Sequence, residues 1–214
     1  MPAPKAVDWY FDFVSPFSYL QFEMMDRIAS LASVRRRPVL LGGILNERGQ
    51  LGPAEIPGKR LFTYRLVQWQ AARYGIPLKF PPSHPFNPIK ALRLSIVLEN
   101  EESAVRTIFR HLWRDGRSID DPADWRALCE RLGQTDVESR IAAPEVKAEL
   151  KQNGDLALAA GLFGVPTFVV DGEPIWGADA TEMVVDCLKH PGMLTEGEFA
   201  RLATLPVGAS RVRG

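Results

Sequence analysis

A serine at the predicted start of a helix is the residue best placed for chemistry in this sequence. The segment Ala6 to Phe13 is rich in aromatic and β-favouring residues, and Ser15-Pro16 ends it. Pro16 suits the first helical position after a serine N-cap. The N–H groups and the positive dipole at a helix N-terminus favour an anion, to which the Ser15 hydroxyl can donate a hydrogen bond. The alternative is that Ser15 only caps the helix.

A second candidate is the tripeptide Val165-Pro166-Thr167, which places a proline directly before a β-favouring segment. A proline inside a central strand would remove a hydrogen bond from the sheet, so Pro166 is predicted at the start of the strand. Its peptide bond can then be cis, a conformation that is rare outside X-Pro bonds. An ordinary trans loop proline is the alternative.

The elements that must position these residues follow from hydrophobic spacing and from turn residues. Helical spacing continues from Pro16 to Leu31, a second strand is predicted at Val34 to Leu41, and a loop follows at Gly42 to Gly58. Six helices are then predicted, at Lys59 to Tyr74, after Asn87-Pro88, at Ser103 to Trp113, Pro122 to Leu132, Asp136 to Ala142 and Pro144 to Ala160. The chain closes with strand Thr167 to Val170, an Asp171-Gly172 hairpin turn, strand Pro174 to Trp176 and helix Ala180 to Leu188.

This order predicts an α/β protein with a thioredoxin-like fold, in which a large all-α insertion separates the β-α-β half from the β-β-α half. We expect residues 1–58 and 161–214 to form a discontinuous thioredoxin-like domain and residues 59–160 to form the helical insertion. A cis-proline beside the N-terminus of the first helix is the usual active-site geometry of that fold. Ser15 and Pro166 are therefore expected to lie close together.

Composition excludes several classes of function. The 214 residues include 26 Lys plus Arg and 26 Asp plus Glu, a balance that argues against a dedicated nucleic-acid binder. Apolar stretches reach only about ten residues, against roughly 20 needed to cross a bilayer, so no membrane span is expected. Cys129 and Cys187 form no CxxC pair, so neither a metal site nor a disulfide framework is predicted. The N-terminus lacks signal-peptide features, and a cytoplasmic location is expected.

Three segments together resemble 2-hydroxychromene-2-carboxylate isomerases and the related kappa-class glutathione transferases. They are Phe11-Asp12-Phe13-Val14-Ser15-Pro16-Phe17-Ser18-Tyr19, His84-Pro85-Phe86-Asn87-Pro88, and Phe163-Gly164-Val165-Pro166-Thr167-Phe168 with Trp176-Gly177-Ala178-Asp179. The resemblance spans the chain to about Leu188. In the wider DsbA-like superfamily the first helix starts with CxxC, where this chain has Ser15-Pro16-Phe17-Ser18, so disulfide exchange is impossible at that site.

The resemblance implies that glutathione is the cofactor. Ser15 would stabilise its thiolate, which is the nucleophilic form of a thiol. The backbone of Val165, beside Pro166, would bind the cysteinyl part, and Ala178 and Asp179 would hold the γ-glutamyl end. Relatives often have Asp-Arg at this last position, whereas this chain has Asp179-Ala180.

Two loop residues are implied as further glutathione ligands. Gln50 falls where relatives have an amide, and Lys59 falls on a lysine used toward the glycyl carboxylate. A solvated charge at a helix start is the alternative for Lys59.

A second-substrate pocket is implied beside these residues. His84 or Asn87 would lie at its mouth and polarise a carbonyl or carboxylate, and Asn87 as only a helix cap is the alternative. Phe17 and Trp176 would offer apolar surface to a flat aromatic substrate.

The function implied is a glutathione-dependent cis-trans isomerase acting on a small aromatic acid. It would convert a 2-hydroxychromene-2-carboxylate to a trans-o-hydroxybenzylidenepyruvate by reversible thiolate addition, bond rotation and elimination. The alternatives are a kappa-like transferase that conjugates glutathione to an electrophile, and a redox-inactive thioredoxin-like module that binds peptides. Analogy also implies a homodimer.

Overall fold

A four-stranded mixed sheet organises the molecule. The computed structural model describes residues 5–209, and the strand order is β2-β1-β3-β4. The central strand β1 (Lys5–Phe11) pairs in parallel with β2 (Ala32–Pro38) and antiparallel with β3 (Thr167–Val170), which pairs antiparallel with β4 (Glu173–Trp176). The Asp171-Gly172 turn between β3 and β4 has positive φ at both residues, so the predicted hairpin is confirmed.

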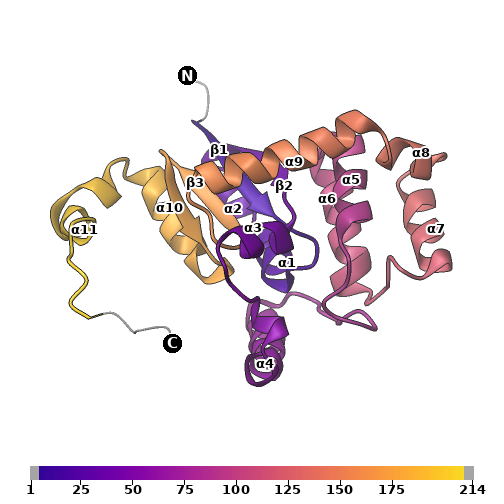
Figure 1. Ribbon diagram of the computed structural model, residues 1–214, viewed down its shortest axis with the longest axis horizontal. Helices are drawn as coiled ribbons and strands as arrows, with labels where there is room; N and C mark the ends of the chain where they lie inside the picture. The colour runs from indigo at the N-terminus through magenta and orange to yellow at the C-terminus, as the bar shows by residue number, and fades with distance from the viewer. Residues whose placement is uncertain (1–4, 210–214) are drawn as a thin grey trace.

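Side chains of the central strand alternate between two hydrophobic clusters. Val7, Trp9 and Phe11 belong to the main core, while Tyr10 belongs to a smaller cluster on the other face. The first face is covered by α1 (Pro16–Glu23), α2 (Asp26–Ala29) and α10 (Thr181–Lys189), and the second by α3 (Leu41–Glu47) and the end of α9 (Pro144–Ala159). Figure 1 shows α9 crossing the sheet.

Between α3 and β3 the chain is helical. Its elements are a 3₁₀ turn (Pro53–Glu55), α4 (Pro57–Tyr74), α5 (Ile89–Val97), α6 (Glu102–Phe109), a π-helical turn (Arg110–Arg114), α7 (Pro122–Arg131), α8 (Val137–Ile141) and α9. In Figure 1, α5 to α8 lie to one side of the sheet and α4 projects below it. The Phe109 ring lies 4.6 Å from that of Phe13 and 5.4 Å from that of Phe22, so the insertion shares the main core.

The predicted fold class is confirmed, and three local predictions are wrong. The helix expected from Pro16 to Leu31 breaks after Glu23, because the Met24 N–H bonds to Gln21 and Phe22 and tightens the turn. The expected loop from Gly42 contains α3, which Gly42 and Gly43 conceal because glycine disfavours helices by about 1 kcal/mol.

The third error lies at the C-terminal end. The helix expected from Ala180 to Leu188 is present as α10, preceded by a 3₁₀ turn (Ala178–Ala180), but it does not close the chain. It is followed by a further 3₁₀ turn (Met193–Thr195) and by α11 (Gly197–Leu202). None of the helices within residues 5–209 combines the length and the hydropathy of a membrane span. The domain limits at residues 58/59 and 160/161 stay a prediction.

Candidate active site

Three loops meet at one end of the sheet. Tyr10 of β1 pairs with Thr167 of β3, and Thr167 pairs with Trp176 of β4. Because both pairings are antiparallel, the loop after β1, the residues before β3 and the residues after β4 lie at the same end. A 2.9 Å hydrogen bond from the Gly177 N–H to the Pro166 carbonyl confirms this convergence.

Ser15 is the N-cap of α1, as the sequence predicts. It is 5% exposed, and its Oγ accepts a hydrogen bond from the Ser18 N–H at 3.2 Å. Since Oγ acts there as an acceptor, its own hydrogen remains available to donate. Within the described chain, the Ser18 hydroxyl is buried and has no hydrogen-bond partner. The start of α1 therefore presents a hydroxyl donor at the positive end of a helix dipole.

Asp12 organises the loop that leads to Ser15. Its carboxylate accepts hydrogen bonds from the Val14 N–H at 3.0 Å and the Leu41 N–H at 2.8 Å. It therefore joins residues 12–15, here called the serine loop, to the start of α3. Complete burial raises the pKa of Asp12 to about 7, although backbone N–H groups lower it in part. The sequence offers no signal for this role beyond a lone acid at the end of an aromatic strand.

The Val165-Pro166 bond is cis, as anticipated. The loop before it is ordered by the buried Thr167 hydroxyl, which donates to the Gly164 carbonyl at 2.8 Å. Among residues 5–209, neither the N–H nor the carbonyl of Val165 forms a hydrogen bond. An extended ligand could therefore pair with this residue as an added strand does.

Gly177 begins the turn that leads into α10, with φ of +104°. This backbone conformation favours glycine, and a Cβ at Gly177 would also displace the exposed Asp179 carboxylate. Asp179 is exposed and folds back over the turn, while Ala178 is buried.

Gln21 connects α1 to this turn, and the sequence did not suggest it. The side chain is fully buried, its Oε1 accepts from Trp9 Nε1 at 2.7 Å, and its Nε2 donates to the Gly177 carbonyl at 2.9 Å and the Thr181 hydroxyl at 3.2 Å. A glutamine within a helical pattern carries no local signal of such contacts.

His84 bonds to the protein through both ring nitrogens. Nε2 lies 2.8 Å from the Val14 carbonyl and Nδ1 lies 2.8 Å from the Tyr64 hydroxyl. A carbonyl only accepts, so Nε2 carries a hydrogen. Burial lowers the pKa of His84, which favours the neutral ring. The His84-Pro85 bond is also cis, which the sequence analysis did not predict.

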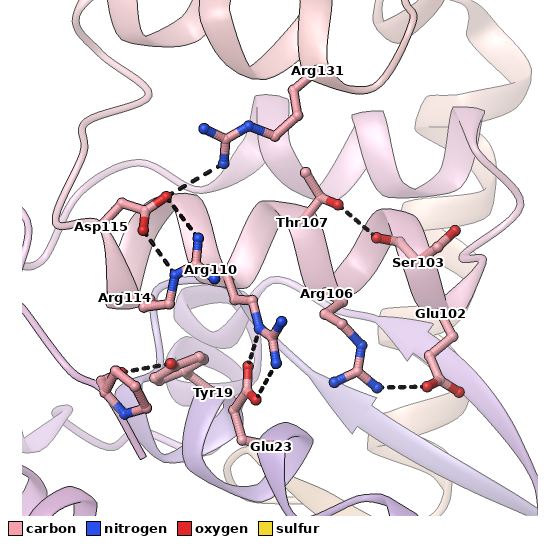
Figure 2. Close-up of polar contacts among 11 residues, drawn as sticks. Tyr19, Glu23, Glu102, Ser103, Arg106, Thr107, Arg110, Arg114, Asp115 and Arg131 are labelled. Carbon is pink, nitrogen blue, oxygen red and sulfur yellow. Dashed lines mark hydrogen bonds and ion pairs between the residues drawn. The ribbon is translucent and has the colours of Figure 1, made fainter.

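Other contacts tie α1 and the loop before it to the insertion. Trp113 Nε1 donates to the Phe13 carbonyl at 2.8 Å, and the Tyr19 hydroxyl donates to the Pro77 carbonyl at 2.7 Å. Figure 2 shows the paired bonds between Glu23 of α1 and Arg110 of the π-helical turn, both 2.8 Å long.

The remaining predicted ligands are not joined to Ser15 by direct contacts. Gln50 and Lys59 are exposed, and Phe17 is half-buried against the main core. Asn87 is exposed, and its Oδ1 accepts from the Ile89 N–H at the start of α5. Trp176 is 52% exposed, and its ring packs against Phe163 with the centroids 5.2 Å apart.

The cis-proline loop and the capped N-terminus of the first helix lie at the same end of the sheet, and a run of helices separates β2 from β3 along the chain. These features define the class of thioredoxin-like proteins with a helical insertion. The chain belongs to the DSBA-like thioredoxin domain family, whose model matches residues 6–189. Several relatives in this family are named as enzymes of glutathione or hydroxychromene chemistry.

Human glutathione S-transferase kappa 1 is 28% identical, and the match covers 94% of this chain and 99% of the relative. The 2-hydroxychromene-2-carboxylate isomerase of Sphingobium xenophagum is 27% identical over 84% of this chain and 96% of its own. A solved 2-hydroxychromene-2-carboxylate isomerase superposes with a TM-score of 0.75 at 24% identity, covering 93% of this chain and 98% of that chain, which supports the fold. The resemblance found in the sequence is thus confirmed.

Proposed function

We propose that this protein is a glutathione-dependent isomerase of 2-hydroxychromene-2-carboxylate-type aromatic acids. The observation that carries the proposal is the Ser15 hydroxyl, which accepts from the Ser18 N–H and keeps its hydrogen for an anion at the start of α1. The names of two groups of relatives, kappa transferases and hydroxychromene isomerases, support the same chemistry.

The residues around Ser15 fit glutathione. Val165 offers an N–H and a carbonyl beside cis-Pro166, and Ala178 and Asp179 begin the turn that bonds to the Pro166 loop. When bound, glutathione would supply a nucleophilic thiolate. Ser15 would donate its hydrogen bond to that sulfur, and Asp179 would hold the ammonium of the γ-glutamyl group. Gln50 and Lys59 are proposed as further ligands, with Lys59 toward the glycyl carboxylate.

The charge of the first part of the insertion fits an acidic second substrate. No Asp or Glu occurs between residues 56 and 98, whereas seven cations do: Lys59, Arg60, Arg65, Arg73, Lys79, Lys90 and Arg93. Such a field attracts carboxylates. We place the aromatic acid beside Phe17 and Trp176, with Asn87 at the edge of the pocket.

The test is the ionisation of glutathione in the binary complex, followed by the ultraviolet absorbance of the thiolate. We expect the thiol pKa to fall by about one to two units on binding, because the helix N-terminus and a hydroxyl donor each stabilise the anion. Ser15→Ala should reverse part of that fall and slow turnover roughly tenfold to a thousandfold. Ser30→Ala, which removes an exposed hydroxyl elsewhere, is the matched control. A thiol pKa unchanged by binding would refute the proposal.

Transfer of glutathione to an electrophile is the second candidate, favoured by the similarity to kappa transferases. Catalytic amounts of glutathione suffice for an isomerase, whereas a transferase consumes one molecule per turnover. Binding of extended peptides without any glutathione binding would instead support a peptide-binding module.

We further propose a homodimer. Helix α4 exposes Leu61, Phe62 and Trp69, which are 54%, 65% and 58% accessible. Burial of this apolar face in a second copy would stabilise association. Light scattering of the wild type and of Phe62→Ser tests the proposal, since a monomeric wild type would refute it.

We also propose a cytoplasmic location. Both cysteines, Cys129 and Cys187, are buried and free, as suits a reducing compartment. Cell fractionation tests this assignment.

A further inference from the structure

The backbone immediately before Ser15 is held by side chains from a distant part of the chain. The carbonyls of Phe13 and Val14 accept hydrogen bonds from Trp113 Nε1 and His84 Nε2, each at 2.8 Å. Both donors belong to the helical insertion, 100 and 70 residues away along the chain. Two consecutive carbonyls of one short loop thus depend on the insertion.

The remaining polar groups of the loop bond to Asp12. The Val14 N–H donates to the Asp12 carboxylate at 3.0 Å, and the Ser15 N–H donates to the Asp12 carbonyl at 3.1 Å. The peptide group between Val14 and Ser15 is therefore fixed at both ends, by His84 at its carbonyl and by Asp12 at its N–H. Its plane, together with the Ser15 φ of −88°, sets the direction of the Ser15 Cα–Cβ bond and hence the region that the hydroxyl can reach.

We propose that Trp113 and His84 are positioning residues that hold the Phe13-Val14-Ser15 backbone and so aim the Ser15 hydroxyl. The effect of this positioning on catalysis rests on the function proposed above. In this assignment His84 acts on the protein backbone and not on the substrate.

Tyr64 completes the arrangement from helix α4. Its hydroxyl lies 2.8 Å from His84 Nδ1 and 2.9 Å from the carbonyl oxygen of the same residue. A carbonyl only accepts, so the single Tyr64 hydroxyl hydrogen is shared between the His84 carbonyl oxygen and Nδ1. Nδ1 is then an acceptor, and the ring hydrogen stays on Nε2, which donates to the Val14 carbonyl. The rings of Phe80 and Trp113 meet the imidazole edge-on and exclude water from one side, with centroids 6.2 and 5.4 Å away.

The chain offers variants that separate positioning from packing. Trp113→Phe removes one N–H and keeps most of the ring. Trp125→Phe makes the same change in the same insertion, but the N–H it removes bonds to Glu138 and not to the serine loop. His84→Gln keeps an amide donor near the Nε2 position, whereas His84→Asn is too short to reach the Val14 carbonyl.

We expect Trp113→Phe and His84→Asn to lower kcat at saturating glutathione roughly tenfold to a hundredfold, as small displacements of a reacting group do. Both should also raise the pKa of the bound thiol, while His84→Gln and Trp125→Phe stay within about threefold of wild type in kcat. Urea unfolding identifies any variant whose fold is lost. The inference is overturned if Trp113→Phe and His84→Asn behave as wild type, or if Trp125→Phe is as slow as Trp113→Phe.

Two measurements decide the inference without glutathione. The nitrogen NMR spectrum of the His84 ring should show hydrogen on Nε2 in the wild type. In Tyr64→Phe the tautomer with hydrogen on Nδ1 should become populated as well. Exchange of the Ser15 amide hydrogen should accelerate in His84→Asn and in Trp113→Phe but not in Trp125→Phe. A ring protonated on Nδ1 alone would overturn the inference. If the wild type forms no thiolate, the proposed function fails while these two results still judge the positioning.

Discussion

The buried carboxyl group of Asp12 should make stability depend on pH. Burial raises its pKa in the folded protein to about 7, while the unfolded chain has a value of about 3.9. At acid pH both states are protonated and the full stability is present. As pH rises, the unfolded state loses its proton first, so the folded state loses stability until pH passes the folded pKa. The folded protein should therefore be less stable at pH 8 than at pH 5 by this contribution.

The magnitude follows from linkage. Between about pH 5 and about pH 8, a shift of this size lowers the free energy of unfolding by roughly 2.5 kcal/mol. Two histidines oppose it, because burial lowers the pKa of His84 and of His111, and each then adds stability as pH rises. The pH dependence of wild-type stability therefore combines the contributions of Asp12, His84 and His111. Comparison with the variant Asp12→Asn isolates the contribution of the Asp12 carboxyl group.

The assay is urea unfolding of wild type and Asp12→Asn at both pH values. At about pH 5 the variant should be the less stable by about 1–3 kcal/mol, because its amide leaves one backbone N–H without an acceptor. At about pH 8 the difference should vanish or reverse. Asp120→Asn, an exposed carboxylate, is the control and should follow the wild type. Parallel pH curves for wild type and Asp12→Asn would refute the reasoning, since they would mean that Asp12 is ionised throughout.

Three further predictions concern the turn into α10 and its link to α1. Gly177→Ala should destabilise the fold by about 1–3 kcal/mol, because φ at Gly177 is +104°, a conformation strained for alanine. Gly58→Ala, where the added Cβ meets no atom, is the control, and equal urea midpoints for the two variants would contradict the prediction. Gln21→Leu leaves two buried groups, Trp9 Nε1 and the Gly177 carbonyl, without a hydrogen-bond partner, which should lower the free energy of unfolding by about 1–3 kcal/mol for each group. The variant should also have a higher KM for glutathione, and an unchanged glutathione affinity in calorimetry would count against a connection between Gln21 and the glutathione site. Asp179→Asn should raise KM for glutathione with little change in kcat, because a contact to the ammonium is the same in ground and transition states; a loss confined to kcat would exclude that role.

Local chemistry predicted a large part of the fold. Pro16 after Ser15, Pro122 after Asp121 and Gly75 after a helical pattern each mark a helix end that the structure has. The Asp171-Gly172 turn and the proline before β3 are equally local signals. These features depend on backbone conformation over a few residues, which neighbouring residue types determine.

The partners of the serine loop could not be predicted in the same way. The resemblance implies His84 at the mouth of a substrate pocket, whereas its ring nitrogens bond to Val14 and Tyr64. The sequence pattern marks Trp113 only as the end of a helix, whereas its indole N–H bonds to the Phe13 carbonyl. Contacts across 70 and 100 residues leave no periodic pattern, because they depend on how separate helices pack.

The same contacts join the insertion to the loop of residues 12–15 before α1. Without the insertion, the Phe13 and Val14 carbonyls would lose their donors, and the Glu23 carboxylate would lose Arg110. Phe109 fills the space among Trp9, Phe13 and Phe22, so its loss would also open the main core. A hydroxyl donates a single directional hydrogen bond, so it binds an anion best when it is held in place. In the proposed function, the contacts from the insertion therefore keep the Ser15 hydroxyl aimed at the glutathione sulfur.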